Sequence, residues 1–257
     1  MSSTAPLKAI PLKTVRTHYT IDGIDLSVAD FQSSVGVDEK GGLFNIECST
    51  SVASDVVVKE LVSDTYRMKE IGFAPGDVVL DLGGHVGIVS MYLAKKYPFL
   101  QIYAYEPSPD NYRHFLDNLD TNDISNVQLF NQAVTADARK LKMIAYYECN
   151  SGGATGQLRE MELPHRVNFE AQSTTLDEIF SERRLASCKL LKIDIEGSEH
   201  EVLMNARCLS KVEFLAGEFH QNDYLLEKGY SIAALCEHLT RFIPEDNIRY
   251  VPCRMAE

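Results

Sequence analysis

The chain has 257 residues, a formal net charge of −12 at pH 7 and a hydrophobic content of 45%. This length suits one α/β domain with an extension, and the acidic balance excludes a large nucleic-acid-binding face, which needs a basic surface. The sequence contains no apolar run long enough for a membrane span and no signal-peptide core at its start, so we expect a cytoplasmic protein that binds neither nucleic acid nor membrane.

Residues 1–75 lack a regular alternation of strand and helix, and we predict that they form an N-terminal extension or cap. The domain proper is predicted to span residues 76–257. Within the extension, short alternating runs over residues 19–44 predict a small hairpin, and apolar spacing over residues 56–71 predicts a helix.

A glycine-rich turn follows the first buried strand, which we place at residues 78–82. Gly83, Gly84 and Gly87 allow the backbone to turn tightly and approach a ligand, and Asp81 is the only charge in the strand. The next strand, residues 101–105, ends at Glu106, a carboxylate placed to accept hydrogen bonds from both hydroxyls of a ribose. The pattern predicts a site for the adenosine part of a cofactor.

The type of cofactor depends on the residues around the glycines. A nicotinamide or flavin fingerprint is G-x-G-x-x-G, and aligning Gly84 and Gly87 with its last two glycines puts Leu82 at the first. Asp81 would repel a pyrophosphate but suits the ammonium of S-adenosylmethionine. We therefore predict S-adenosylmethionine, with His85 facing it and with Gln132 and Ala133, after the third strand, beside the adenine.

The rest of the chain alternates strands with helices, which predicts a doubly wound, mostly parallel sheet. Capping signals open helices at Ser108, at Thr175 with Glu178, and at Ser198 with Glu201. Glycines predict a loop over residues 150–156. Strands are predicted at residues 127–130, 141–147, 189–195, 212–219 and 248–253, and helices at 86–97 and 230–242.

Two strand ends carry acidic residues and a histidine. Asp194 and Glu196 lie at the carboxyl end of the fourth strand of the sheet, and Glu218 and His220 lie at the end of the fifth. Asp194 is predicted to contact the methionine end of the cofactor or the acceptor, and Asp194 and His220 are the candidate bases. Asp194, Glu218 and His220 are alternatively candidate ligands for a divalent metal such as Mg²⁺. A purely structural role for the pair after the fourth strand is the competing interpretation.

Several segments resemble the FkbM family of S-adenosylmethionine-dependent methyltransferases. They are residues 79–87, 105–109 (Tyr-Glu-Pro-Ser-Pro), 131–134, 173–177, 190–197 (Leu-Leu-Lys-Ile-Asp-Ile-Glu-Gly) and 218–220. The resemblance implies a class I methyltransferase fold, with a seven-stranded sheet whose last strand is antiparallel. It also implies that Asp81, Gly83 and Gly87 line the methionine end and that Glu106 holds the ribose. The family usually has Gly-Ala-Asn where this chain has Gly83-Gly84-His85.

The resemblance further implies methyl transfer to oxygen, commonly to a hydroxyl on a polyketide, a sugar or another natural product. The expected partner is therefore a small-molecule acceptor, whose identity the sequence does not give. A homodimer formed through the N-terminal extension is also compatible with the sequence. The alternatives are transfer to nitrogen, a catalytically silent scaffold that binds S-adenosylmethionine, and a nicotinamide oxidoreductase, which Leu82 disfavours.

Overall fold

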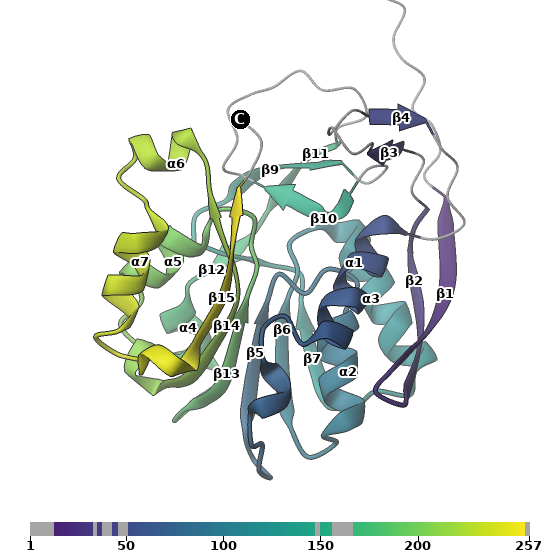
Figure 1. Ribbon diagram of the computed structural model, residues 1–257, viewed down its shortest axis with the longest axis horizontal. Helices are drawn as coiled ribbons and strands as arrows, with labels where there is room; N and C mark the ends of the chain where they lie inside the picture. Colours follow the sequence, from purple (N-terminus) through teal and green to yellow (C-terminus); the bar gives the residue numbers. More distant parts are fainter. Residues whose placement is uncertain are drawn as a thin grey trace, which may run out of the picture.

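The centre of the molecule is a six-stranded sheet in which every neighbouring pair is parallel (Figure 1). The computed structural model describes residues 13–32, 35–37, 43–45, 51–146, 150–155 and 167–254. The strand order is β15-β14-β13-β5-β6-β7. In chain order these strands are β5 (Val78–Leu82), β6 (Gln101–Tyr105), β7 (Val127–Phe130), β13 (Cys188–Ile193), β14 (Val212–Gln221) and β15 (Ile248–Arg254).

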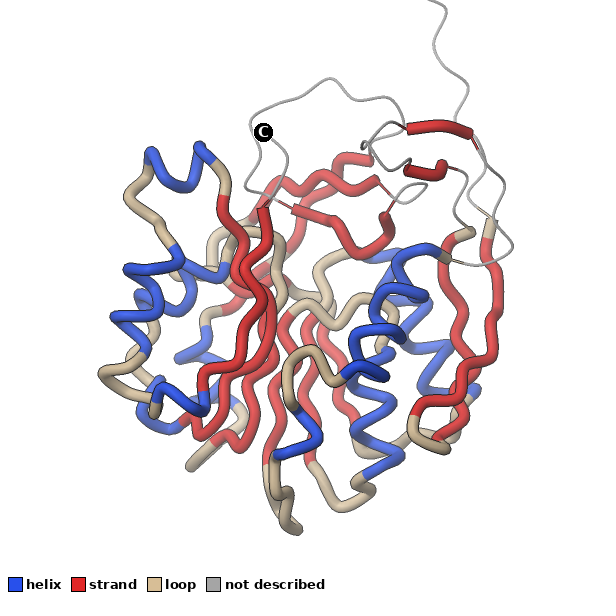
Figure 2. Tube along the Cα trace, viewed as in Figure 1, coloured by secondary structure: helices blue, strands red, loops and turns tan. Residues whose placement is uncertain are grey.

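Helices cover both faces of this sheet, which explains why its strands read as nearly unbroken apolar runs (Figure 2). Successive side chains alternate between two cores, so that Val79 packs with α1, α2 and α3, whereas Leu80 packs with α4, α5 and α7. The helices are α1 (Val52–Ser63), α2 (Ile88–Lys96), α3 (Pro109–Thr121), α4 (Leu176–Glu182), α5 (Glu199–Asn205), α6 (Asp223–Glu227) and α7 (Ile232–Leu239), with 3-10 turns at Met68–Glu70, Leu209–Lys211 and Glu245–Asn247. No helix among the described residues has the length and apolar character needed to cross a membrane.

The strand count corrects one expectation. In place of seven strands with an antiparallel last one, the described residues form a sheet of six, and β15 pairs parallel to β14 from Leu215–Ile248 to Gln221–Arg254. The cause is the crossover through α7, which returns the chain to the same end of the sheet before the last strand begins.

The N-terminal part packs against the main domain. Strands β1 (Thr14–Ile21) and β2 (Ile24–Phe31) form the predicted hairpin around Asp22 and Gly23, both of which have positive φ. Buried side chains of the hairpin share one core with the sheet and with α2. The predicted helix over residues 56–71 starts earlier and ends earlier, because Ser51 caps the start of α1 and Asp64 ends it in the left-handed conformation.

A small antiparallel sheet lies beyond the carboxyl edge of the main sheet (Figure 1). It contains β9 (Leu141–Tyr146), β10 (Asn150–Thr155) and β11 (Val167–Ala171), and α1 contacts β10. The prediction of a loop over residues 150–156 is wrong for residues 150–155, because pairing with β9 stabilises a strand there in spite of its glycines. The remaining short pairs are β3 (Val35–Val37) with β4 (Leu43–Asn45) and β8 (Ala133–Val134) with β12 (Ser173–Thr174).

Candidate active site

A cavity of about 360 Å³ lies at the carboxyl edge of the main sheet, between α1, β9 and the strand ends. Its size falls in the range of small-molecule sites, and its position is where open α/β sheets bind ligands. Most of the residues predicted to bind the cofactor line it: Gly83, Gly84, His85, Glu106, Gln132, Ala133 and Asp194.

The glycine turn is closely packed on its protein side. Gly83 has φ +83, and a Cβ there would lie 1.8 Å from the carbonyl oxygen of Asp194. Gly87 has φ +95, and a Cβ there would lie 2.2 Å from the ring of Phe115. Gly87 does not line the cavity. Its role in this structure is to let α2 begin directly against the buried ring of α3.

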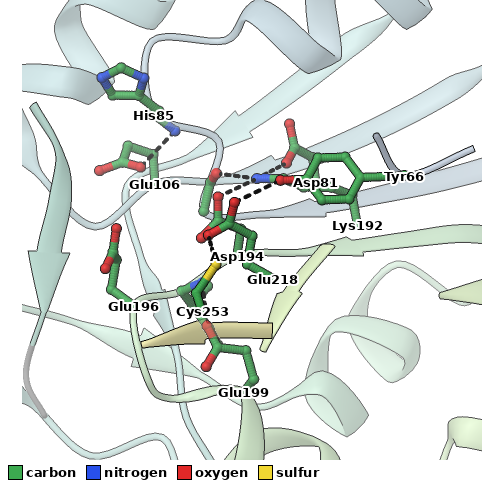
Figure 3. Close-up of polar contacts among 12 residues, drawn as sticks. Tyr66, Asp81, His85, Glu106, Lys192, Asp194, Glu196, Glu199, Glu218 and Cys253 are labelled. Atoms are coloured by element: carbon green, nitrogen blue, oxygen red, sulfur yellow. Dashed lines mark hydrogen bonds and ion pairs between the residues drawn. The ribbon is translucent and has the colours of Figure 1, made fainter. Parts of the chain in front are cut away.

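His85 connects the glycine turn to the N-terminal extension. Its backbone has φ +51, and its N–H donates to Oε2 of Glu106 over 2.8 Å (Figure 3). The ring Nε2 lies 3.6 Å from Oδ2 of Asp30, a buried carboxylate that also accepts hydrogen bonds from Ser51 and Ser54 at the start of α1. Burial lowers the pKa of His85, so the ring is neutral at pH 7.

Glu106 directly follows β6 and forms part of the cavity wall. Besides His85, the backbone N–H of Ser108 donates to it over 2.9 Å, and the side chain is nearly fully buried. Burial raises the pKa of Glu106 to about 7, although these hydrogen bonds favour the charged form. The carboxylate is thus held in one orientation at the point where the cofactor ribose is predicted to lie.

Asp81 lies beneath the turn and does not line the cavity. Only 1% of it is exposed; Ser90 donates to its Oδ2 over 2.6 Å, and Nζ of Lys192 lies 3.3 Å from its Oδ1. Lys192 also donates to the carbonyl oxygen of Gly83 over 2.7 Å. Asp81 thus forms an ion pair that holds the turn through Lys192, and its contact with the cofactor stays a prediction (Figure 3).

Sequence reasoning did not identify Lys192, although the signal was present. Asp81 and Lys192 are charges in two buried strands, and these strands pair in register at these two residues. Burial by itself lowers the pKa of Lys192, but the carboxylates of Asp81 and Asp194 raise it above its ordinary value, so the ammonium stays charged.

The comparison with known proteins identifies the family. The model of the methyltransferase FkbM domain matches residues 81–246, more than half of the chain. The chain belongs to the FkbM methyltransferase family. This confirms the resemblance found in the motifs and the predicted doubly wound class I methyltransferase fold, apart from the strand count.

Relatives of this FkbM-family protein are distant. The 31-O-demethyl-FK506 methyltransferase FkbM of Streptomyces tacrolimicus is 24% identical over 208 residues, which cover 70% of this chain and 79% of that protein. Methyltransferase 1 of Beauveria bassiana is 25% identical over 146 residues, 51% of this chain, and the match spans only 59% of that protein. Among solved structures, precorrin-6y C5,15-methyltransferase from Geobacter metallireducens is 14% identical over 70% of each chain, with a TM-score of 0.41.

One wall of the cavity in this FkbM-family protein is acidic. Glu60, Asp194, Glu196 and Glu218 line it, and the Tyr66 hydroxyl donates to Oε1 of Glu218 over 2.9 Å (Figure 3). Burial raises the pKa of Glu60 to about 7 and that of Glu196 to about 8, and it also raises the pKa of Asp194. Glu60 and Tyr66 belong to the N-terminal extension and were not predicted, because no local motif marks them.

His220 lies behind this acidic wall and does not line the cavity. Its Nδ1 is 3.0 Å from Oε1 of Glu199, and its Nε2 is 3.4 Å from Glu218 and 3.6 Å from Glu196. Burial lowers the pKa of His220, but the surrounding carboxylates, Glu199 first, raise it to about 10. Proton abstraction by His220 stays a prediction, and its surroundings disfavour it because the ring already carries its proton at pH 7.

The start of α5 differs from the predicted capping box. Ser198 makes no side-chain cap, and Glu201 instead binds Arg139 over 2.7 Å. The neighbouring Glu199 is fully buried and accepts hydrogen bonds from the backbone N–H groups of Ile195 and Gly197. The loop after β13 therefore folds around one carboxylate, which also fixes the ring of His220.

Proposed function

We propose that this FkbM-family protein is an S-adenosylmethionine-dependent methyltransferase that methylates a hydroxyl group of a small molecule. The observation that carries the proposal is the position of Glu106. Glu106 directly follows β6 and lines the same cavity as the glycine turn. A carboxylate at this position can accept hydrogen bonds from the hydroxyls of a ribose.

The residues present fit the cofactor. Glu106 would accept hydrogen bonds from the ribose, and Gln132 and Ala133 would lie beside the adenine. Asp194 would place a carboxylate near the glycine turn, next to the ammonium group of the cofactor. The acidic cavity suits a cationic ligand and disfavours a pyrophosphate. When bound, S-adenosylmethionine supplies a methyl group that its sulfonium makes electrophilic.

The other half of the cavity is suited to an acceptor with an apolar body. Val52, Val56 and Val57 on α1 face the cavity together with Leu141 and Met143 on β9, and we call these five residues the acceptor wall. A hydrophobic wall beside a few polar groups is typical of sites that orient small organic molecules.

Glu60 is the proton acceptor that the geometry favours. It lines the cavity one helical turn beyond Val56, on the same face of α1. A carboxylate whose pKa is about 7 can accept a proton from a hydroxyl at neutral pH. When the methyl group passes from the sulfonium sulfur to the acceptor oxygen, leaving S-adenosylhomocysteine, Glu60 would accept the hydroxyl proton. Asp194 and His220, the bases predicted from the sequence, are the alternatives.

Transfer to oxygen is supported by the name of the Streptomyces relative, a 31-O-demethyl-FK506 methyltransferase. Transfer to nitrogen is the alternative, and the same assays distinguish the two by the product. A catalytically silent scaffold would bind the cofactor and yield no methylated product.

The first test is calorimetry with S-adenosylhomocysteine, with NAD as a control ligand. We expect binding to the wild-type protein, at least tenfold weaker binding to Glu106→Ala, and no binding of NAD. Glu182→Ala is the matched control, because Glu182 is 62% exposed, forms an ion pair with Arg183 and does not line the cavity. A folded wild-type protein that does not bind S-adenosylhomocysteine would refute the proposal.

The second test is turnover with methyl-labelled S-adenosylmethionine and a panel of hydroxylated and amino acceptors. We expect Glu60→Gln to lower kcat about 100-fold or more and to leave the affinity for S-adenosylhomocysteine unchanged. Wild-type turnover in Glu60→Gln would remove Glu60 from the mechanism and return the assignment to Asp194 or His220.

A further inference from the structure

Three side chains on the acidic side of the cavity have the arrangement of metal ligands. Asp194, Glu196 and His220 each offer one ligand atom, and these atoms all lie within 4.8 Å of one another. The set mixes two carboxylates with an imidazole and comes from two neighbouring strand ends. It is therefore more than a patch of like charges.

The orientation of His220 is a second, independent observation. Its Nδ1 lies 3.0 Å from Glu199, a carboxylate with no exposed surface, which the N–H groups of Ile195 and Gly197 hold in place. The opposite nitrogen, Nε2, points to Glu196 and Glu218 at 3.6 and 3.4 Å, longer than ordinary hydrogen bonds. A metal-binding histidine usually donates its other ring N–H to a carboxylate, as Nδ1 of His220 can to Glu199.

Glu218, predicted from the sequence as the third ligand, is engaged elsewhere. Its Oε1 accepts from the hydroxyl of Tyr66, and its Oε2 accepts from the thiol of Cys253, both over 2.9 Å. Glu196 also lies close to His220, and its ligand atom is within 4.8 Å of those of both Asp194 and His220, whereas Glu218 is grouped in this way with His220 and Cys253. Glu196 is the better partner for Asp194.

We infer that Asp194, Glu196 and His220 bind one divalent cation at the edge of the cavity, and that Glu199 positions the histidine. The ion binds the neutral imidazole, so it displaces from Nε2 the proton that the surrounding carboxylates otherwise hold there. Two carboxylates with one imidazole suit an ion that accepts both oxygen and nitrogen ligands, such as Mn²⁺. The ion also offsets the charge of a cavity wall that contains five carboxylates, Glu60, Glu106, Asp194, Glu196 and Glu218. Among the described residues of that wall, Lys192 is the only lysine or arginine, and it is already paired.

The role of the ion rests on the proposed function. A divalent cation next to the acceptor wall binds a hydroxyl oxygen and lowers the pKa of the hydroxyl. Glu60, in the same cavity, then takes the released proton.

The experiment titrates Mn²⁺ alone into the metal-free chain of 257 residues and detects the free ion by electron paramagnetic resonance. We expect one ion per chain and binding at least tenfold weaker in Asp194→Asn and Glu196→Gln. Glu199→Gln should weaken binding about 10–100-fold through the histidine. Glu201→Gln is the matched control, since Glu201 lies on the same helix but pairs with Arg139, and its affinity should equal that of the wild type.

Circular dichroism confirms that each variant is folded, and S-adenosylhomocysteine binding is measured in the same metal-free samples. No saturable binding below about 1 mM Mn²⁺, or wild-type affinity in both Asp194→Asn and Glu196→Gln, would overturn the inference. Wild-type affinity in Glu199→Gln would overturn the positioning role. If S-adenosylhomocysteine binds and Mn²⁺ does not, only the metal site fails. If Mn²⁺ binds and S-adenosylhomocysteine does not, the proposed function fails and the metal site stands.

Discussion

Replacing Asp81 with asparagine tests the ion pair beneath the glycine turn. The carboxylate is 1% exposed and the ammonium of Lys192 is 5% exposed, so neither charge can turn to solvent when its partner is removed. Removing one member of a buried ion pair costs about 3–5 kcal/mol of unfolding free energy. In Asp81→Asn, Nζ of Lys192 retains two other partners, the carbonyl oxygen of Gly83 at 2.7 Å and Oδ2 of Asp194 at 3.9 Å. We therefore expect a loss of about 3 kcal/mol of unfolding free energy, the lower end of that range.

The assay is urea unfolding at pH 7 of the wild type, Asp81→Asn, Lys192→Met and the double variant. The double variant removes both charges and leaves neither unpaired. Its loss of unfolding free energy should therefore be smaller than the sum of the two single losses by at least about 2 kcal/mol. Asp120→Asn, on the surface of α3, controls for the loss of a carboxylate. Additive losses, or a loss in Asp81→Asn below about 1 kcal/mol, would refute the argument that this pair supports the turn.

Two further predictions concern the same site. Gly87→Ala should lower the unfolding free energy by about 2–4 kcal/mol, because its Cβ meets the ring of Phe115 and its φ is +95; a thermal midpoint equal to that of the wild type would contradict this. For Glu106, whose pKa is raised to about 7, the carboxylate that ribose hydroxyls require is lost as the pH falls through 7. Calorimetry should therefore show affinity for S-adenosylhomocysteine rising about tenfold or more from about pH 6 to about pH 8 in the wild type, and Glu106→Gln should remove about tenfold of that rise.

The buried strands could be predicted closely from the sequence. Strands β5, β6 and β7 match the predicted residues because each is an apolar run covered on both faces and bounded by turn residues. Strand β10 was missed because its glycines favour a loop locally, and only pairing with β9 makes it a strand. The last strand of the sheet was expected to be antiparallel, and only the path of the chain through α7 shows that it is not.

The residues of the site likewise fall into those that local sequence predicts and those that depend on contacts distant in the chain. Glu106 and the glycine turn follow from local sequence, because a strand end and a tight turn are local features. The partners of Asp81 and Glu218 do not follow from local sequence. Lys192 lies beside Asp81 because of the register of two strands, and Tyr66 lies beside Glu218 because the extension packs against the domain. The raised pKa of Glu60 has the same origin, because it depends on burial by residues distant in the chain.

The division of the cavity between two stretches of chain has a consequence for how such enzymes diversify. The segment that matches the family, residues 81–246, contains the glycine turn and Glu106, whereas α1 precedes it and contributes Val52, Val56 and Val57 to the acceptor wall. Mutations at these three valines can thus change the acceptor wall without altering the glycine turn or Glu106. Exchange of these α1 positions between homologues, with Glu60 retained, would be a direct route to new acceptor preferences.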